Sequence, residues 1–527
     1  MLDAIVIGAG PSGLGASIAL SGHLPHYTPA CIVEDPRLEA RLGALIASKS
    51  DGLIQAADLP LLSSGLRGRS NNPLALFFDA LQHPGVDTGY AAPSCLELRL
   101  DANAALSHLV VDPLPPGGSW HGMHDATKTL SPGPWMEFPG FPLARFLADH
   151  AALQPEAAVT AALQLQPRST IAEYYRAAAE HFGVTKSYRP WRVESVVRTP
   201  AASSLSGGSS QPPTWTVTFA DSVSPPLRAR ALVLATGTYS RPRRLGVPGE
   251  GLGFVSHRCK DLATGSRAAR EPTLAPASSR PTVLVVGAGL SAADCVVHLL
   301  RTTGAHVIHA FRGAPDATKV GSKFGSAAVA RMYPEYVALV AAMRGSADDE
   351  AENRTAGASS GRGGEIKARA LLGGQYTPLP DAQLRQIHSD GTCELAVTTP
   401  QSDATTLTLS TYKVDEVAVL IGSTPDWSFL PSDVTDALAR AGEAPNVSAE
   451  GVEATHPVFV DVDPLSLEAR AVPGMFALGP LRGDNFARFA MHDGHGVASA
   501  LRARIAMEHP EQERNEAPAS CDGSETP

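Results

Sequence analysis

Two glycine-rich segments have the residue types and spacing that bind the phosphates of a dinucleotide. They are Gly8-Ala9-Gly10-Pro11-Ser12-Gly13, after the apolar run 4–7, and Gly287-Ala288-Gly289-Leu290-Ser291-Ala292, after the apolar run 282–286. Each predicts a strand, a tight turn and a helix whose first backbone N–H groups bind a pyrophosphate. The first glycine makes the turn, the second lets backbone approach the phosphate, and the third small residue lets helix pack on strand. Two such loops in one chain indicate two bound dinucleotides.

The residue after the second strand of the second unit indicates which dinucleotide binds there. Residues 305–311 are the expected second strand, and Arg312 follows them. A carboxylate at this position would accept the 2′-hydroxyl of NAD, whereas an arginine offers bidentate bonds to a 2′-phosphate. NADPH is therefore expected, and a solvated arginine at a strand end is the alternative for Arg312.

The elements that must position these loops are typical of an α/β protein with long irregular insertions. Residues 22–107 form an unusually long insertion for a nucleotide-binding half. Four segments rich in small or polar residues are expected to be loops, linkers or a disordered tail: 201–213, 264–281, 345–364 and 509–527. Periodicity predicts helices at 11–21, 74–81 and 171–182, and strands at 109–111, 215–219 and 231–235.

Composition excludes several classes of function. The chain has 527 residues and a net charge of −10, which argues against a nucleic-acid partner. Its six cysteines include no C-x-x-C pair, so neither a zinc site nor a redox disulfide is predicted. No run of about 18 apolar residues predicts a transmembrane segment, and the first strand begins too early for a signal peptide. A cytoplasmic protein is expected.

Further motifs lie in collinear order over most of the chain. They read GRSNNP at 68–73, PGGSWH at 116–121, WMEFPG at 135–140, ATG at 235–237, MYPEY at 332–336 and ALGPLRGDNF at 477–486. With the first glycine loop, these motifs make the chain resemble flavin-dependent monooxygenases of the two-dinucleotide-binding type. Within that class it is most similar to the oxidative stress-induced growth inhibitor family.

The resemblance implies two Rossmann-like, three-layer dinucleotide-binding domains. The FAD domain is discontinuous, with residues 1–245, including the insertion 22–107, and residues 416–508. An NADPH domain, 246–415, is inserted between these parts and contains the nucleotide unit 282–312. Residues 509–527 are the expected tail, and a homodimer is left open.

The resemblance also assigns residues to the flavin. Gly117 and Gly118 are expected to pass close to its phosphate and ribityl region, with Trp120 packed nearby; the alternative is an ordinary Pro-Gly turn beside a buried tryptophan. Asp484 is expected to accept a ribityl hydroxyl, and it could equally cap a helix. Gly237 and Gly479, in the matching segments, complete the expected cofactor-binding set.

Two acids compete for the adenosine ribose of FAD. Glu34 follows residues 30–33 and has roughly the spacing of about 20 residues that a dinucleotide fold predicts. Asp112 ends the strand 109–111, shortly before Gly117 and Gly118. We favour Asp112 because it adjoins a second flavin motif, and we expect the other acid to be solvated.

The implied reaction is oxygenation of a lipophilic small molecule. NADPH would reduce FAD, and O2 would form a C4a-(hydro)peroxyflavin that must be kept from water. The alternatives are an uncoupled NADPH oxidase that makes H2O2, and a non-catalytic growth- or stress-regulatory interaction protein that retains the fold.

Catalytic residues are less well defined, because the chain departs from the wider class. The class pattern F-x-G-x-x-x-H keeps its glycine and His257 but lacks its phenylalanine, so His257 is a catalytic or a structural candidate. The class asparagine expected just before Trp135 is missing. Asn71 and Asn72, on the insertion, are candidates to replace it.

Overall fold

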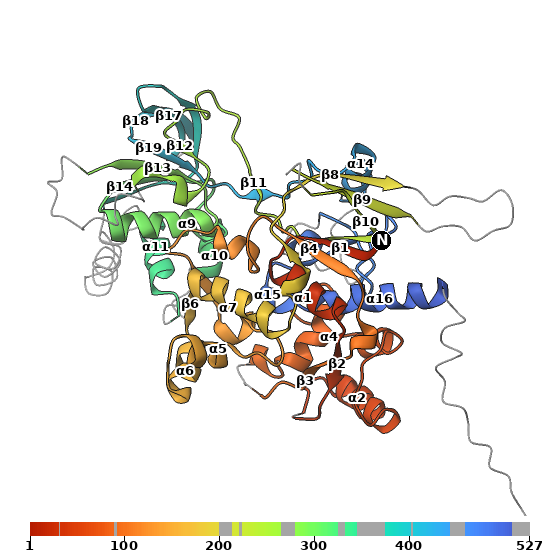
Figure 1. Cartoon of the computed structure of the whole chain (residues 1–527). Helices are drawn as coiled ribbons and strands as arrows, with labels where there is room; N and C mark the ends of the chain where they lie inside the picture. Colours follow the sequence, from red (N-terminus) through yellow and green to blue (C-terminus); the bar gives the residue numbers. More distant parts are fainter. Residues whose placement is uncertain are drawn as a thin grey trace, which may run out of the picture. The chain divides into compact units, whose positions relative to one another are not determined.

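The computed structural model describes residues 1–30, 32–88, 92–199, 213–220, 224–264, 280–324, 332–344, 375–401, 404–442 and 459–508. The chain divides into two compact units (Figure 1). Unit 1 contains Met1–Gly122, Lys128–Thr238 and Pro425–Pro527, and unit 2 contains Met123–Thr127 and Tyr239–Thr424. The predicted linkers 201–213, 264–281 and 345–364 lie almost wholly outside the described residues, and the tail 509–527 lies outside them entirely.

Unit 1 is built on a seven-stranded sheet with the order β7-β4-β1-β10-β9-β8, in which β21 also pairs with β10. The strands around β1 are parallel, with Val6 opposite both Val110 and Val233, whereas β8, β9 and β10 form an antiparallel meander. The strands are β1 (Leu2–Ile7), β4 (His108–Val111), β7 (Tyr188–Arg189), β8 (Val193–Thr199), β9 (Thr214–Phe219), β10 (Leu227–Leu234) and β21 (Met475–Ala477).

Both faces of this sheet are buried. Ala4 and Val6 belong to one hydrophobic cluster with helices on that face, and Ile5 and Ile7 belong to a second cluster. Successive side chains of a strand point to opposite faces, so β1 must be apolar throughout, as parallel strands usually are. Unit 1 therefore has three layers. Its main helices outside the insertion are α1 (Pro11–Leu20), α5 (Leu143–His150), α6 (Pro155–Ala162), α7 (Arg168–His181), α14 (Ser432–Gly442), α15 (Ala487–Ala490) and α16 (Asp493–Glu508).

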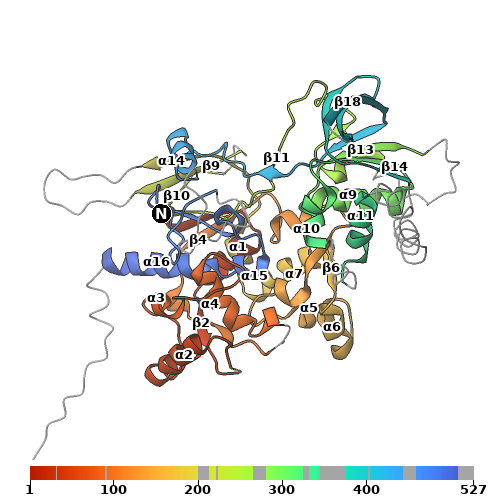
Figure 2. The same cartoon turned by 180° about the vertical axis from the view of Figure 1, so that it is seen from behind.

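Small residues let α1 and the start of α16 approach closely. A Cβ on Gly15 would lie 2.0 Å from the carbonyl oxygen of Met491, and one on Gly494 would lie 2.5 Å from the Cα of Ala16. These contacts hold the C-terminal segment against the helix of the first glycine loop. Figure 2 shows the same helices from behind, with α5, α6 and α7 together beyond them and the ribbon of β5 (Lys128–Pro132) and β6 (Leu165–Pro167) nearby.

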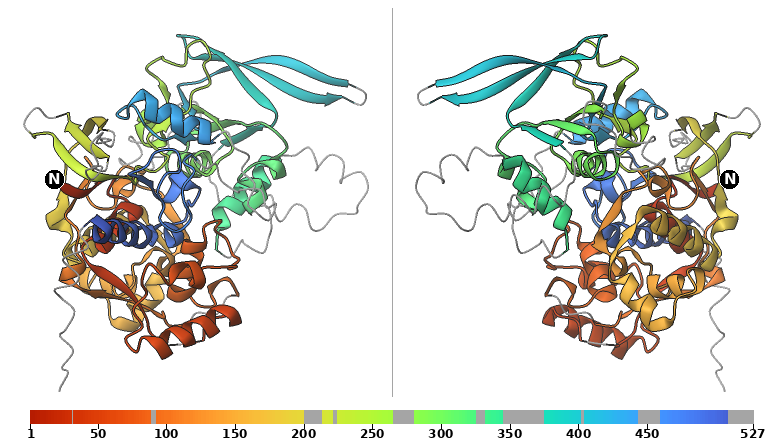
Figure 3. Two further views of the ribbon diagram at one scale, coloured as in Figure 1. Left: turned by 90° about the vertical axis from the view of Figure 1, so that its right-hand side faces the viewer. Right: turned by 90° about the vertical axis from the view of Figure 1, so that its left-hand side faces the viewer.

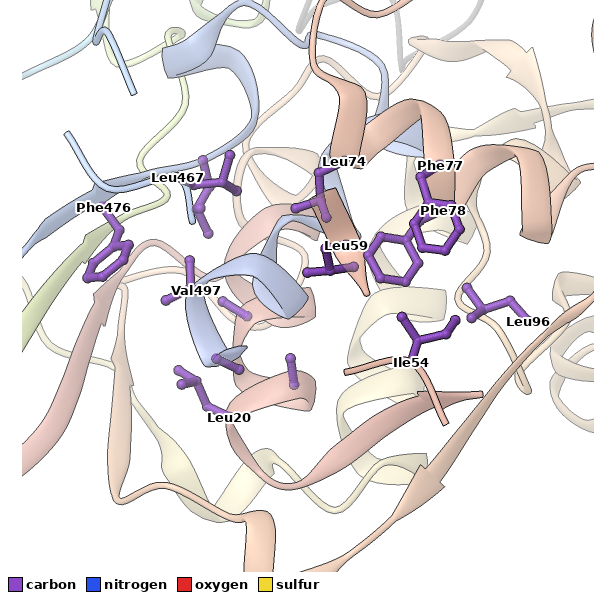
Figure 4. Packing of buried hydrophobic residues seen from close by; sticks show 14 of the residues in the cluster. Leu20, Ile54, Leu59, Leu74, Phe77, Phe78, Leu96, Leu467, Phe476 and Val497 are labelled. Carbon is purple, nitrogen blue, oxygen red and sulfur yellow. The ribbon is translucent and has the colours of Figure 1, made fainter. Parts of the chain in front are cut away.

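The insertion is part of the unit 1 core. It contains an antiparallel ribbon of β2 (His23–Tyr27) and β3 (Leu96–Leu100), and helices α2 (Pro36–Ser48), α3 (Leu59–Leu62) and α4 (Pro73–Gln82). Phe77 and Phe78 of α4 pack in one cluster with Leu20 of α1 and Val497 of α16 (Figure 4). Residues 30–33, which the Glu34 hypothesis needed as a second strand, form no strand among their described members.

Unit 2 is built on the all-parallel sheet β12-β19-β13-β14-β15, with a separate antiparallel sheet β16-β17-β18. Figure 3 shows the β17–β18 hairpin extending from the rest of the unit. The strands are β11 (Arg241–Pro242), β12 (Val255–Ser256), β13 (Thr282–Val286), β14 (His306–Ala310), β15 (Gln375–Leu379), β16 (Ala382–Ile387), β17 (Thr392–Gln401), β18 (Ala404–Lys413), β19 (Glu416–Val419) and β20 (Ser423–Thr424), and the helices are α9 (Leu290–His298), α10 (Gly321–Phe324) and α11 (Pro334–Arg344).

The predicted α/β class is confirmed, with one sheet in each unit that contains parallel strands around a glycine loop. The predicted helices at 11–21, 74–81 and 171–182 correspond to α1, α4 and α7. The boundary near 416 differs, because β19 pairs with β13 and β12 in the unit 2 sheet. The chain therefore returns to unit 1 at Pro425 rather than at residue 416.

Candidate functional site

The first glycine loop is held tightly on one side and is open on the other. Gly8 has φ of +108°, and a Cβ on it would lie 2.4 Å from the carbonyl oxygen of Ala235. Its N–H donates to the Val111 carbonyl at 2.9 Å. Gly10 caps α1, Pro11 is the first helical residue, and no atom lies within 4 Å of a Cβ built on Gly10. That space fits the close approach of a phosphate to backbone.

The helix after this loop packs as the pattern predicts. A Cβ on Gly13 would lie 1.9 Å from the Gly8 carbonyl oxygen, so only glycine fits where the helix meets the strand. Ser12 is buried beside Gly479, whose added Cβ would lie 2.3 Å from the Ser12 hydroxyl. The C-terminal segment thus reaches the start of α1.

The second glycine loop repeats this geometry in unit 2. A Cβ on Gly287 would lie 2.2 Å from the Leu420 carbonyl oxygen, and the Gly287 N–H donates to the Ala310 carbonyl at 3.0 Å. Gly289 caps α9, which begins with Leu290 and Ser291, and has open space around the position of a Cβ. Both loops therefore offer a free helix N-terminus beside a glycine.

Gly117 and Gly118 lie against the first loop. The Gly117 N–H donates to the Ala9 carbonyl at 2.8 Å, and a Cβ on Gly118 would lie 2.9 Å from the Gly10 nitrogen. Trp120 is half-buried and packs against an aromatic cluster of unit 1. The sequence motif thus lies beside the open face of Gly10, and its tryptophan is at the same time part of the core.

The structure separates the two acids proposed for the ribose. Asp112 follows β4, which is the strand next to β1, and Glu34 is exposed and follows no strand. The Asp112 carboxylate accepts from the Ala9 N–H at 2.7 Å and from the Leu114 N–H at 2.8 Å. Burial raises the pKa of Asp112. Asp112 therefore holds the ordinary position for a ribose-binding acid and also braces the glycine loop.

Asp484 lies in a buried ionic cluster. Its carboxylate accepts hydrogen bonds from the Ser70 hydroxyl at 2.8 Å and from the Arg482 guanidinium. Arg482 is also paired with Asp493, whose carboxylate accepts from the Gly479 N–H at 2.7 Å. The alternative that Asp484 caps a helix is wrong: α15 begins at Ala487 and α16 at Asp493.

Arg312 and His309 lie at the end of β14. Arg312 is exposed and follows the buried Phe311. His309 is buried, with Nε2 at 2.6 Å from the Gly287 carbonyl oxygen and Nδ1 at 2.8 Å from the Tyr376 hydroxyl. Burial lowers the pKa of His309 to about 4. A neutral histidine thus supports the second loop, while the predicted phosphate-binding arginine faces solvent.

The catalytic candidates lie in different units and have separate partners. Asn72 caps α4 by accepting from the Ala75 N–H at 2.9 Å, and its amide donates to the Pro464 carbonyl at 3.1 Å. Asn71 is exposed and lines a cavity with Asp484. In unit 2, His257 Nε2 lies 2.9 Å from a Glu250 carboxylate oxygen. Those contacts favour structural roles for Asn72 and His257, whereas Asn71 keeps a free position.

Gly237 follows β10 and has open space around a Cβ position. Among the residues that the structure describes, no cluster of three or more His, Cys, Asp or Glu side chains could hold a metal ion. Over the same residues, no helix is long and apolar enough to cross a bilayer.

Comparison with characterised proteins identifies the family. No protein-family model matches the chain. The mouse protein oxidative stress-induced growth inhibitor 1 is 34% identical over 520 residues, which cover 97% of this chain and 97% of that protein. The chain belongs to the oxidative stress-induced growth inhibitor family. The resemblance drawn from its sequence motifs is thereby confirmed.

Two solved structures of flavoproteins share the fold of this chain. Bacillithiol disulfide reductase from Staphylococcus aureus matches with a TM-score of 0.52 at 15% identity, over 95% of this chain and 98% of that one. Ornithine N-hydroxylase from Kutzneria matches with a TM-score of 0.50 at 16% identity, over 96% of this chain and 100% of that one. These likenesses show a shared two-dinucleotide-binding fold.

Several residues that support the candidate site were not predicted from the sequence. Ser70, Arg482 and Asp493 fix Asp484, and His309 supports the second loop. Tyr336, in the MYPEY motif, donates a hydrogen bond to the half-buried Asp294 of α9. Ser70 and Tyr336 lie inside family motifs, so their position was signalled, but their partners are distant in sequence.

Proposed function

We propose that this chain is an FAD-containing, NADPH-dependent monooxygenase that oxygenates a small molecule with an apolar part. The observation that carries the proposal is the pair of open glycine loops. In unit 1 the strand next to the loop strand is followed by the acid Asp112, and in unit 2 it is followed by Arg312. Asp112 suits the ribose hydroxyls of FAD, and Arg312 suits the 2′-phosphate of NADPH. The solved ornithine N-hydroxylase of the same fold was determined with reduced FAD, NADP+ and L-ornithine, which agrees with this pairing.

The residues of unit 1 would bind and orient the flavin. Gly10 leaves space for its phosphates, Gly118 packs directly against Gly10, and Asp484 is held for a ribityl hydroxyl by Ser70 and Arg482. Because Arg482 and Asp493 are both buried, the carboxylate of Asp484 has little freedom to turn away. FAD, when bound, would take a hydride from NADPH and transfer electrons to O2.

The residues of unit 2 would bind the reductant. The N–H groups at the start of α9 face the open side of Gly289, and His309 fixes the carbonyl of Gly287. Arg312, exposed at the end of β14, would select the phosphorylated dinucleotide. Coupling of reduction to oxygenation then depends on the pocket around Asp484, where water must be excluded.

Two other functions compete with this one. An uncoupled NADPH oxidase would use the same loops but release H2O2. A growth- or stress-regulatory interaction protein would keep the fold without turnover. The described cysteines Cys95, Cys259, Cys295 and Cys393 form no disulfide, and the sequence offers no C-x-x-C pair for disulfide reduction.

The stoichiometry of turnover separates these functions. NADPH consumption, O2 consumption and H2O2 release are measured on the purified full chain, with and without a panel of apolar amines, sulfides and carboxylic acids. A monooxygenase uses NADPH faster with one of these compounds and releases less H2O2 per NADPH. An oxidase gives one H2O2 per NADPH whatever is added, and an interaction protein gives no turnover. The expected cytoplasmic location and the homodimer remain predictions, to be checked by cell fractionation and light scattering.

A further inference from the structure

Three of the family motifs meet at one place in unit 1. Arg69 comes from GRSNNP, Trp135 from WMEFPG, and Arg488 follows the GDNF segment. The Arg488 guanidinium lies 4.7 Å from the centre of the Trp135 ring, and the Arg69 guanidinium lies 5.7 Å from it. The insertion, the central part and the C-terminal part of unit 1 are therefore joined around one tryptophan.

The Arg488 guanidinium binds two carboxylates, those of Asp79 and Asp87. Arg488 is buried, and its guanidinium bonds to both carboxylate oxygens of Asp79, at 2.6 and 2.7 Å. It also bonds to Asp87 at 2.9 and 3.2 Å. Two carboxylates around one buried guanidinium leave an excess negative charge, which the nearby Arg69 offsets.

Arg69 is held in place but keeps its hydrogen-bond donors. Its guanidinium also lies 5.3 Å from the centre of the Phe486 ring, and its side chain is 50% exposed. Its ion pair with Asp87, at 3.7 Å, is longer than a hydrogen bond. Among the described residues it donates no hydrogen bond of normal length. Stacking against two rings limits its motion, so the planar set of N–H donors is available and already oriented.

Arg69 lies at the wall of a cavity beside the proposed flavin site. The cavity has a volume of about 160 Å³. Its lining mixes polar groups, among them Arg69, Asp461 and Asp484, with the apolar side chains of Val462, Pro464 and Phe486. Arg482 is held by both Asp484 and Asp493, and the Asp461 carboxylate in the lining pairs with Arg470 at 3.6 Å. Arg69, whose contact with Asp87 is longer than a hydrogen bond, is therefore the lining cation with N–H donors still available.

We propose that Arg69 binds the carboxylate of an apolar carboxylic acid, and that this acid is the substrate class of the proposed oxygenation. The claim that this acid is a substrate rests on the proposed function, whereas the claim that Arg69 binds a carboxylate does not. A guanidinium matches a carboxylate with two parallel hydrogen bonds, and the apolar side chains of the lining would take the adjoining methylene groups. The acid would thus be anchored beside Asp484, with its chain free to reach toward the flavin.

Arg145 provides a matched control. It also lies over one aromatic ring, Phe141, at 5.8 Å, and has a loose ion pair with Asp149 at 3.8 Å. Its side chain is 55% exposed, close to the exposure of Arg69. It is on α5 and is not part of the cavity wall. The two arginines therefore have similar exposure and similarly loose ion pairs, but Arg69 lines the cavity and Arg145 does not.

Calorimetric titration of the FAD-loaded full chain tests the proposal with four probes of one chain length: octanoate, octanol, octylamine and octyl phosphate. Octanoate is expected to bind at least about tenfold more tightly than octanol or octylamine. Arg69→Gln should abolish this preference, Arg69→Lys should retain part of it, and Arg145→Gln should leave it unchanged. Equal binding of octanoate and octanol, an unaffected Arg69→Gln variant, or a stronger preference for octyl phosphate would overturn the proposal.

The same samples separate failure of this inference from failure of the proposed function. FAD content, unfolding temperature and flavin midpoint potential are measured for each variant. Arg69→Gln is expected to keep the FAD content and the midpoint potential, and to lower the unfolding temperature slightly because the positive charge beside Asp87 is lost. A shifted potential would show that Arg69 serves the flavin instead. If NADPH reduces the flavin but octanoate is not preferred, only the inference fails. If octanoate is preferred but NADPH never reduces the protein, only the proposed function fails.

Discussion

The two glycine loops have the same local geometry, but the chain reaches the second strand of each sheet by a different route. In unit 2, β14 follows α9 after one short connection. In unit 1, the ribbon β2–β3 and three helices come between α1 and β4. A spacing rule counted from the loop therefore finds Arg312 but points to Glu34 instead of Asp112. We therefore propose the ribose-binding acid from its position in the sheet, Asp112 after the strand next to β1, and not from its distance along the chain.

The insertion also changes what surrounds the first loop. It supplies Ser70 to Asp484 and Asp79 and Asp87 to Arg488, so the C-terminal segment is held by residues that a shorter connection would lack. The second loop has a simpler support, the single buried His309. We infer that the first site is braced by an ionic network and the second by one neutral ring.

The largest expected effect tests whether the two glycine loops have the same local geometry. Gly8→Ala and Gly287→Ala place a Cβ at 2.4 and 2.2 Å from a carbonyl oxygen. Each should lower the free energy of unfolding by about 3 kcal/mol or more. Gly10→Ala and Gly289→Ala meet no atom within 4 Å, so they should change it by less than about 0.5 kcal/mol and impair only cofactor binding. Urea unfolding of the apoprotein and FAD retention measure both; a Gly8→Ala variant as stable as the wild type would contradict the shared geometry.

The next prediction sharpens the contrast through pH. The folded-state pKa of His309 is about 4, below its ordinary 6.5. Its stabilising contribution is therefore complete above pH 6.5 and is lost as the pH falls toward 4, by about 3 kcal/mol at most. The raised pKa of Asp112 has the opposite sign, because the folded state takes up a proton before the unfolded state does.

Acidification should thus weaken unit 2 through His309, and it should weaken unit 1 as well, because burial also lowers the pKa of His492 and His495. The measurement is the urea midpoint of each unit from pH 7.5 to 4.5, with His309→Gln as the variant. A wild-type unit 2 whose midpoint is as flat with pH as that of the variant would count against the role of His309.

A smaller effect is expected at Arg312. Arg312→Gln should weaken NADPH binding about 10- to 100-fold, or roughly 1.4 to 3 kcal/mol, because a bidentate phosphate contact is lost. NADH binding should not change. Fluorescence titration with both dinucleotides checks this, and an equal loss for NADPH and NADH would show that Arg312 supports the loop and does not select the phosphate.

The smallest effect decides between the two acids of unit 1. Asp112→Asn keeps one acceptor oxygen and loses the other, so one of the two N–H groups it binds loses its partner. The expected cost is about 1 to 2 kcal/mol of stability, with weaker FAD retention. Glu34→Gln should change neither quantity. If Glu34→Gln releases FAD and Asp112→Asn does not, the assignment from sheet position is wrong.

The sequence predicted features set by neighbouring residues. Both loops, α1, α4 and the strands β1, β4, β13 and β14 follow from local apolar periodicity and from Gly and Pro at turns. It failed where partners are distant: the described residues 30, 32 and 33, before Glu34, form no strand, and β19 joins the unit 2 sheet. Ser70 could not be assigned, because its partner Asp484 is more than 400 residues away in the sequence. Arg482 could not be assigned, because its pairing with both Asp484 and Asp493 depends on how the segment 479–493 folds.

The central claim is that one chain holds FAD in the first loop and NADPH in the second. Anaerobic rapid mixing of the FAD-loaded protein with NADPH, and separately with NADH, tests it most directly through the visible absorbance of the flavin. The account predicts fast bleaching by NADPH, slow bleaching by NADH, and loss of that difference in Arg312→Gln. A protein that binds no FAD, or whose flavin stays oxidised with both dinucleotides, would contradict it.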